Sequence, residues 1–123
     1  MLTVKYSTRF LKDAKRLKEK KNFRKIADDI REIEESLRAG KDQGNLIPGL
    51  SGLQIFKIRQ RNNSTNTGKS GGFRIIYYQM WENNIAIMLT IYSKTEENNI
   101  SKEEILEILQ QENLMPNNTK SHL

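Results

Sequence analysis

A row of evenly spaced apolar residues constrains the fold of this chain more than any other feature of its sequence. These residues recur at intervals of three and four positions, at Phe23, Ile26, Ile30, Ile33 and Leu37. Because an α-helix has about 3.6 residues per turn, this spacing places them in one stripe along one side of a helix. Gly40 follows where the left-handed residue that ends many helices is expected. The spacing therefore predicts a helix that packs one side against the core.

A further helix is expected just before this one. Its apolar face contains Phe10, Leu11, Ala14 and Leu17, with lysines and arginines on the other side. Ser7 or Thr8 can cap its start, because a hydroxyl group accepts a hydrogen bond from an unpaired backbone N–H group. The region around Asn22 separates the two helices, so we expect a helical hairpin. Before them, residues 2–6 alternate apolar and polar side chains, which predicts a half-buried strand.

Three more strands are predicted in the second half of the chain, at residues 54–61, 73–81 and 85–94. Residues 82–84 supply a tight turn, so the last two strands form an antiparallel hairpin. Residues 41–53 are rich in glycine and are predicted to be a loop. Ser101 and Glu104 have the spacing of a capping box ahead of a last helix. The expected order is β-α-α-β-β-β-α, an α+β fold with the helical hairpin packed on a small, mainly antiparallel sheet.

The length of the chain, 123 residues, favours one domain, which we place at residues 1–112. Residues 113–123 are expected to form a disordered tail. No apolar run approaches the roughly 18–20 residues of a transmembrane helix, and the first residues lack the apolar stretch of a signal peptide. We therefore expect a cytoplasmic protein with no membrane partner.

Positive charge is concentrated in the predicted strands. The formal net charge is +6, and between residues 54 and 94 six basic residues stand against Glu82 alone. Such an excess indicates a polyanionic partner, either nucleic acid or an acidic protein. Charge that only keeps the protein soluble is the other interpretation.

Alternation within the strands predicts which side chains share a face. The aliphatic residues of the last strand are expected under the helical hairpin, at Ile85, Ile87, Leu89 and Ile91. The other face of the sheet would then be open and would carry Lys57, Arg59, Arg61, Arg74, Lys94, and Tyr78 or Tyr92. Cations with interleaved aromatic rings are typical of surfaces that hold phosphates and stack bases. This open face is the candidate site.

Composition argues against several kinds of chemistry. The chain has no cysteine, and its only histidine is His122, so thiolate, histidine-based and histidine-ligated metal sites are not expected. The acidic residues show no cluster suited to a two-metal nuclease. Gly68-Lys69-Ser70 imitates the end of a phosphate-binding P-loop, but Asn63 stands where that motif needs glycine. We expect no metal and no cofactor, so catalysis would depend on Lys, Arg and Tyr.

Residues 62–72, which connect two of the predicted strands, contain no apolar side chain. Such a segment cannot bury apolar area to offset the entropy of ordering, so we expect it to be mobile. It links the strands that carry Arg59 and Arg74 and is expected to overhang the candidate site. Its only charged residue, Lys69, would then reach a phosphate. A plain solvated connector is the alternative.

The run from Gly68 to Tyr78, GKSGGFRIIYY, resembles the core signature of toxins of the RelE/ParE superfamily, most closely the HigB-type branch. Residues 49–53 (GLSGL), 57–59 (KIR) and 89–94 (LTIYSK) fit the same family. The similarity covers roughly residues 4–110, and the family's fold would give the same order of elements. The resemblance implies a toxin of a type II toxin–antitoxin system. Such a toxin cleaves mRNA, commonly on the ribosome, and is silenced by a cognate antitoxin, here expected to be of helix-turn-helix type.

Carried over by position, the resemblance implies catalytic roles for Lys57, Arg59, Arg74 and Lys94. To these we add RNA contacts by four residues of the same strands and loop, Arg61, Lys69, Tyr78 and Tyr92. Thr95 and Ser101 stand where RelE-like patterns have arginine and tyrosine, so the general base stays open between Lys57 and Lys94.

The expected reaction is attack of the 2′-hydroxyl on the adjacent phosphorus, which gives a 2′,3′-cyclic phosphate and a 5′-hydroxyl. Arg59 and Arg74 would stabilise the phosphate charge. A lysine can act as the base only where its surroundings lower its pKa.

Two other functions stay open at this point. One is a module that binds RNA or an antitoxin and has a weak or lost active site. The other is a ParE-like gyrase poison on the same fold. The set Lys57, Arg59 and Arg74 argues against the gyrase poison, since that activity does not need a cluster of cations on the sheet.

Overall fold

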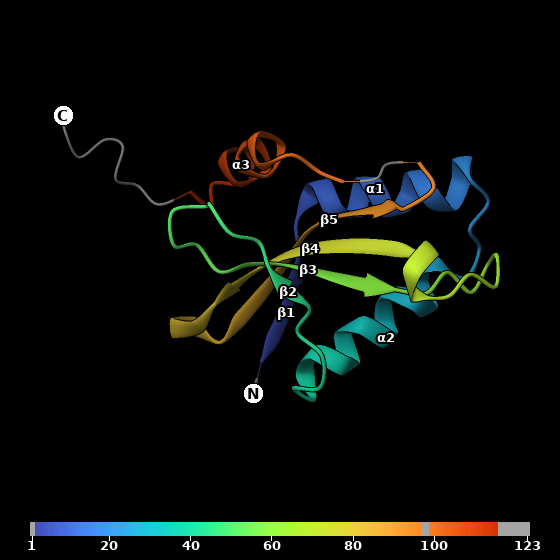
Figure 1. Ribbon diagram of the computed structural model, residues 1–123, viewed down its shortest axis with the longest axis horizontal. Helices are drawn as coiled ribbons and strands as arrows, with labels where there is room; N and C mark the ends of the chain where they lie inside the picture. The colour runs from blue at the N-terminus through green and yellow to red at the C-terminus, as the bar shows by residue number, and fades with distance from the viewer. Residues whose placement is uncertain (1, 97–98, 116–123) are drawn as a thin grey trace.

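A five-stranded sheet forms the centre of the fold, and helices lie on both of its faces (Figure 1). The computed structural model describes residues 2–96 and 99–115. In chain order the elements are β1 (Thr3–Tyr6), α1 (Thr8–Lys20), α2 (Ile26–Arg38), β2 (Asn45–Leu46), β3 (Ile55–Gln60), η1 (Lys69–Gly71), β4 (Phe73–Met80), η2 (Trp81–Asn83), β5 (Ile85–Ser93) and α3 (Lys102–Gln111). The expected α+β class and order are confirmed, and the short strand β2 is an addition.

The strands lie in the order β1-β5-β4-β3-β2. Strand β1 runs parallel to β5, and the other neighbouring pairs are antiparallel. The expected turn after β4 is present, and Asn84 closes it in the left-handed conformation, at φ 54°. The strand itself ends at Met80, one residue earlier than expected, and Trp81 begins the helical turn η2 with 53% of its surface exposed.

The predicted helix ends are formed by the expected chemistry. The hydroxyl oxygen of Ser7 accepts the backbone N–H of Phe10 at the start of α1, and Ser101 accepts that of Glu104 at the start of α3. Gly40 follows α2 at φ +67°, a conformation that favours glycine. The expected start of α2 is wrong by one turn, because Phe23 is buried in the connection that precedes the helix.

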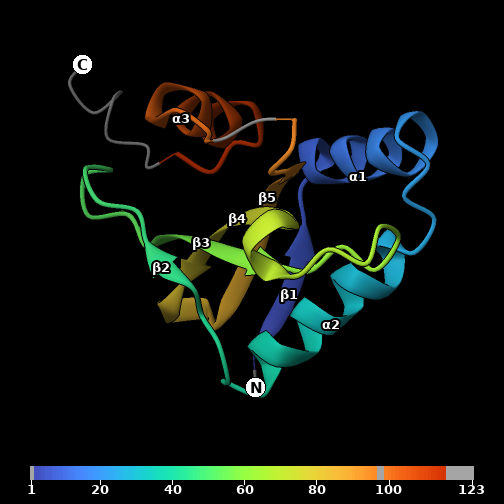
Figure 2. The same cartoon turned by 45° about the vertical axis from the view of Figure 1, so that its right-hand side comes forward.

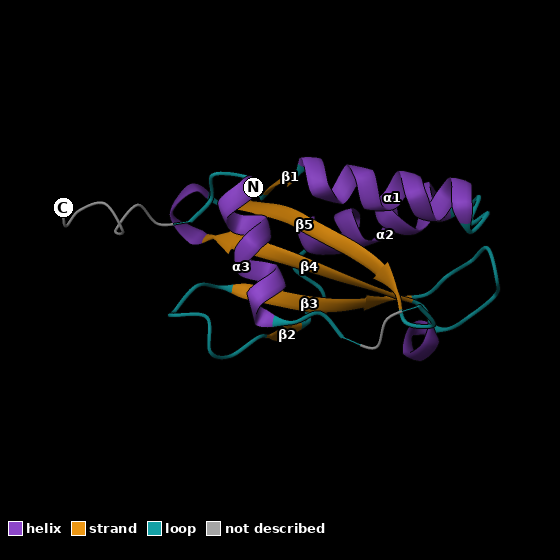
Figure 3. Cartoon of the chain, turned by 90° about the horizontal axis from the view of Figure 1, so that it is seen from above, coloured by secondary structure: helices purple, strands orange, loops and turns teal. Residues whose placement is uncertain are grey.

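Each face of the sheet has its own apolar core. Helices α1 and α2 pack on one face, against Ile58, Phe73, Ile75, Tyr77, Ala86, Met88 and Ile91. Helix α3 crosses the other face (Figure 3) and packs against Ile55, Ile76 and Leu89. The expectation of a fully open second face is therefore wrong, since the apolar side of α3 also has to be buried.

A β-bulge explains why the expected aliphatic face of β5 is also wrong. Opposite the bond between Ile76 and Tyr77, the register moves from Thr90 to Met88, so Leu89 is an extra residue in β5. Ile87 and Leu89 face α3, whereas Ile91 faces the helical hairpin. An extra residue reverses the alternation, so a strict period of two cannot assign both halves of this strand to one face.

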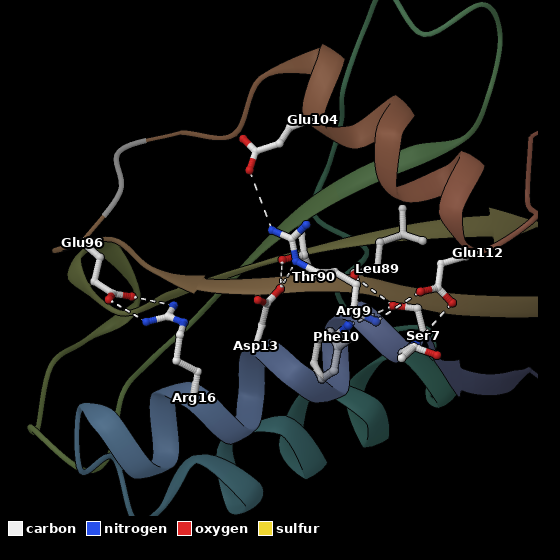
Figure 4. Close-up of polar contacts among 11 residues, drawn as sticks. Ser7, Arg9, Phe10, Asp13, Arg16, Leu89, Thr90, Glu96, Glu104 and Glu112 are labelled. Atoms are coloured by element: carbon white, nitrogen blue, oxygen red, sulfur yellow. Dashed lines mark hydrogen bonds and ion pairs between the residues drawn. The ribbon is translucent and has the colours of Figure 1, made fainter.

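Helix α3 is joined to the start of α1 by polar contacts (Figure 4). The Glu112 carboxylate accepts the backbone N–H groups of Thr8 and Arg9, each at 3.2 Å. The Arg9 guanidinium also lies 3.7 Å from the Glu104 carboxylate. These contacts hold both ends of α3 relative to α1.

The chain after α3 does not leave the domain at once. Leu114 and Met115, which we assigned to the tail, are partly buried against the core under α3. The remainder of the expected tail, residues 116–123 with His122, lies outside the described residues. Among the described residues, no helix is long and apolar enough to cross a membrane.

The connection at residues 62–72 is anchored, contrary to expectation. Asn63 donates two hydrogen bonds to Asp29, whose side chain is fully buried in α2. The hydroxyl of Ser64 accepts the backbone N–H of Lys25 at 2.8 Å. The first part of the connection therefore leans on the helical hairpin (Figure 2), whereas its η1 part lies against Arg74 of the basic face. Polar side chains replaced the missing apolar anchor, which the sequence pattern did not indicate.

Candidate functional site

Three of the predicted site residues lie in one row across the sheet. Arg59 of β3 pairs with Arg74 of β4, and Arg74 pairs with Tyr92 of β5. Lys57 lies two residues before Arg59, so it points to the same side of β3. This side is the one that α3 partly covers, because Ile55, Ile76 and Leu89 belong to it. We call Lys57, Arg59, Arg74 and Lys94 the cation cluster.

Within the cation cluster, Lys57 has surroundings that favour its neutral form, which can accept a proton. Burial lowers the pKa of its ammonium group, and the nearby charges of Arg74, Arg59 and Lys94 lower it further. Both causes act against the charged form. The fraction of neutral Lys57 amine at a given pH is therefore larger than for an ordinary lysine.

Arg74 is buried, with only 4% of its surface exposed. Its guanidinium donates to the backbone oxygens of Lys69 and Ser70, each at 2.9 Å, and to that of Phe73 at 3.3 Å. Burial, and then the neighbouring Arg59, lower the pKa of Arg74. The residue therefore holds the η1 turn in place, and in this conformation both of its terminal amino groups already donate to backbone oxygens.

Gly72 allows β3 and β4 to approach closely beside this row. A Cβ atom at this position would lie 2.2 Å from the backbone oxygen of Gln60. The backbone oxygen of Gly72 also accepts the N–H of Lys94 at 2.9 Å. Gly72 thus lies where the end of β3, the start of β4 and the end of β5 meet, which places Lys94 beside the rest of the cation cluster.

The two predicted tyrosines occupy different positions. Tyr92 is in the row beside Arg74, with 4% of its surface exposed. Tyr78 lies four residues further along β4, opposite Ile55 and Ile87, and is partly buried against the core under α3. The structure therefore brings Tyr92, but not Tyr78, next to Arg74.

The alternation predicts that Arg61 shares the face of Lys57 and Arg59, but in the structure it does not. It lies beyond the end of β3, and its guanidinium donates to the Glu32 carboxylate of α2 at 2.8 Å. Lys69 and Arg61 line the same hollow, together with Glu32 and Gln60. The strand period does not apply past Gln60, where attraction to a helix carboxylate directs the side chain.

Asn99 is a site residue that the sequence analysis missed. Its side-chain oxygen accepts a hydrogen bond from the Lys57 Nζ at 3.1 Å, across 42 positions of sequence. Thr95 and Ser101, the positions where RelE-like patterns differ, have other partners. The Thr95 hydroxyl lies 2.8 Å from that of Ser93, and Ser101 caps α3.

The described part of the chain contains no group of three or more His, Cys, Asp or Glu side chains that could hold a metal ion. What the arrangement offers is a cluster of cations with one amine that is easier to deprotonate. Such a set can hold a phosphate, stabilise charge that develops on its oxygens, and accept one proton.

No protein-family model matches the chain. Solved structures do resemble it. A double arginine-to-alanine variant of the E. coli toxin RelE in its free state has a TM-score of 0.53 and 17% identity, and the match covers 89% of this chain and 96% of that one. The crystal structure of the isolated E. coli RelE toxin in its P21 form has a TM-score of 0.50 and 16% identity, and the match covers 90% of this chain and 98% of that one. The fold of this chain is therefore the fold of the RelE toxin.

Proposed function

We propose that this chain is the toxin of a type II toxin–antitoxin system and that it cleaves mRNA. Two independent findings support the proposal. The fold is that of a known toxin, and the cation cluster combines phosphate-binding groups with a lysine of lowered pKa. The grouping of Lys57, Arg59, Arg74 and Lys94 on one side of the sheet is the observation that carries the proposal, and the lowered pKa of Lys57 agrees with it.

In the proposed reaction, the neutral Lys57 amine accepts the proton of the 2′-hydroxyl. The 2′-oxygen then attacks the adjacent phosphorus, and the bond from phosphorus to the 5′-oxygen breaks. The leaving 5′-oxygen takes a proton from Lys94 or from water, and the other product is a 2′,3′-cyclic phosphate. Arg59, which is exposed, contacts the phosphate and stabilises its developing charge.

Arg74 acts differently from Arg59 in this proposal. Because its donors bind backbone oxygens of η1, its first role is to hold that turn and to add positive charge behind the scissile phosphate. Tyr92 packs beside it, and Tyr78 and Lys69 provide RNA contacts outside the reacting group.

The proposed partners follow from the same assignment. They are mRNA on the ribosome and a cognate antitoxin of helix-turn-helix type, all in the cytoplasm. An ordinary lysine is almost fully protonated near neutral pH, so only a small fraction of such side chains can accept a proton. Placement of the RNA by the ribosome would therefore supply a large part of the acceleration.

The test is to induce the protein in cells and map mRNA 5′ ends by primer extension. The wild type should produce new ends and arrest growth, whereas Lys57→Met and Arg59→Gln should do neither at equal expression. Lys18→Met, which removes an exposed charge of α1, is the matched control and should behave as wild type. Growth arrest with DNA breaks and intact mRNA would instead favour a gyrase poison. Intact mRNA together with intact DNA would favour a module that only binds.

A further inference from the structure

Asn99 lies at a junction between the cation cluster and helix α3. The next residue, Ile100, is buried in the core under α3, with 8% of its surface exposed. Ser101 then caps the helix. Asn99 is therefore attached directly to a fixed part of the fold, although its own side chain is at the surface.

The side-chain oxygen of Asn99 has two donors. It accepts the backbone N–H of Ile100 at 3.2 Å and the Lys57 Nζ at 3.1 Å. The first contact fixes the orientation of the amide group, because the donor belongs to the residue that is buried under α3. The second contact then gives the flexible Lys57 side chain one defined direction.

The other charged groups that face Lys57 cannot take this role. Within residues 2–96 and 99–115 they are Arg59 on its own strand, Arg74 on β4 and Lys94 just after β5, and all three are cations. A cation offers no acceptor for an amine N–H, so these groups repel the ammonium form without orienting it. The Asn99 oxygen supplies the acceptor that the cluster lacks.

We propose that Asn99 is the positioning residue of Lys57, and that it fixes the rotation of the amine by accepting one of its N–H bonds. A neutral amine has two N–H bonds and one lone pair. With one N–H directed to Asn99, the lone pair has fewer directions available and can be held toward the substrate. This inference rests on the proposed function for its catalytic meaning, but the contact itself can be tested without RNA.

The direct test is NMR titration of the Lys57 side chain in the free protein, with its signal identified by its loss in Lys57→Met. Asn99→Ala removes an acceptor that favours the charged form, so the measured pKa of Lys57 should fall. Asn99→Asp keeps an acceptor and adds a negative charge, so the pKa should rise by about one pH unit. A residue that only shapes the turn before α3 would not produce shifts of opposite sign.

Ser101→Ala is the control for general loosening of this region. It removes the cap of α3 without removing a contact of Lys57, so the Lys57 titration should stay at the wild-type pH. Equal titration in wild type, Asn99→Ala and Asn99→Asp would overturn the inference. So would a Ser101→Ala shift as large as that of Asn99→Ala.

The second readout is RNA cleavage by the same variants. Asn99→Ala should lower kcat by about 10- to 100-fold with KM little changed, because a misdirected base affects the chemical step and not RNA binding. In Asn99→Asp, the rise of the rate with pH should move to higher pH. If the NMR shifts occur but the wild type cleaves no RNA, the positioning contact stands and the proposed function fails. If the wild type cleaves RNA and Asn99→Ala is equally fast, the positioning role fails instead.

Discussion

Replacement of Arg74 by alanine should destabilise the protein, in addition to any effect on catalysis. The side chain is 4% exposed and donates to three backbone oxygens, two of them at 2.9 Å. Its cross-strand neighbour Arg59 is exposed and provides a matched control. Arg74→Ala and Arg59→Ala remove the same kind of side chain from adjacent strands.

The size of the effect follows from the two shorter bonds. A hydrogen bond from a charged donor contributes about 1.5–3 kcal/mol. Lys69 and Ser70 are exposed, so water can replace part of what their oxygens lose, and the lower end of that range applies. Two such bonds give about 3 kcal/mol, which corresponds to a fall in Tm of roughly 10 °C for a domain of this size.

The assay is urea unfolding of both variants beside the wild type, followed by circular dichroism. Arg59→Ala should lie within about 0.5 kcal/mol of the wild type, since it removes an exposed charge that faces another cation. Both variants should lose growth inhibition. Equal unfolding midpoints for Arg74→Ala and wild type would refute the tethering role of Arg74 and return it to the phosphate-contact role expected from the sequence.

Three further outcomes are expected from individual contacts. The rate of RNA cleavage should rise with pH as the Lys57 amine loses its proton. It should level off at a lower pH than an ordinary lysine would give, because the pKa of Lys57 is lowered. Lys57→Met should abolish this rise in the pH–rate profile. Asp29→Ala should cost about 1–3 kcal/mol in urea unfolding and raise hydrogen exchange at residues 62–68, since Asn63 loses both acceptors while Arg74 still holds η1. Unchanged exchange would contradict this anchor. Gly72→Ala should lower Tm more than any other substitution proposed above, because its Cβ would lie 2.2 Å from the Gln60 backbone oxygen. A Tm equal to that of the wild type would show that β3 and β4 can separate at this point without cost.

Local chemistry made much of the fold predictable from the sequence. The caps at Ser7 and Ser101 and the end of α2 at Gly40 each depend on a few neighbouring residues, and all three form as expected. Strands β3 and β4 alternate as predicted, so Lys57 and Arg59 share a face. Patterns of this kind contain the information because backbone geometry sets their period.

Features that depend on distant residues were missed. The bulge at Leu89 reverses the faces of β5, and no residue type in that strand indicates where an extra residue will be placed. The anchor of residues 62–72 needs Asp29, which is more than 30 positions away in α2. The sequence pattern indicates that α3 has an apolar side, but it does not indicate that this side covers part of the basic face.

The candidate site shows the same division. The row of Arg59 and Arg74 follows from strand alternation and pairing, and both residues lie together as expected. That Arg74 is buried and bonded to η1, and that Arg61 turns to Glu32, depends on packing beyond the strands. Asn99 reaches Lys57 only because α3 folds back over the sheet.

The proposed activity is cleavage of RNA through the 2′-hydroxyl with Lys57 as the base. The most direct measurement compares ribosome-bound mRNA with the same mRNA carrying a single 2′-deoxy nucleotide at the mapped cleavage position. The all-ribose mRNA should be cut to a 2′,3′-cyclic phosphate and a 5′-hydroxyl, and the 2′-deoxy mRNA should stay intact at that position. Cleavage of both at equal rates, or products that carry a 5′-phosphate, would contradict the proposed activity.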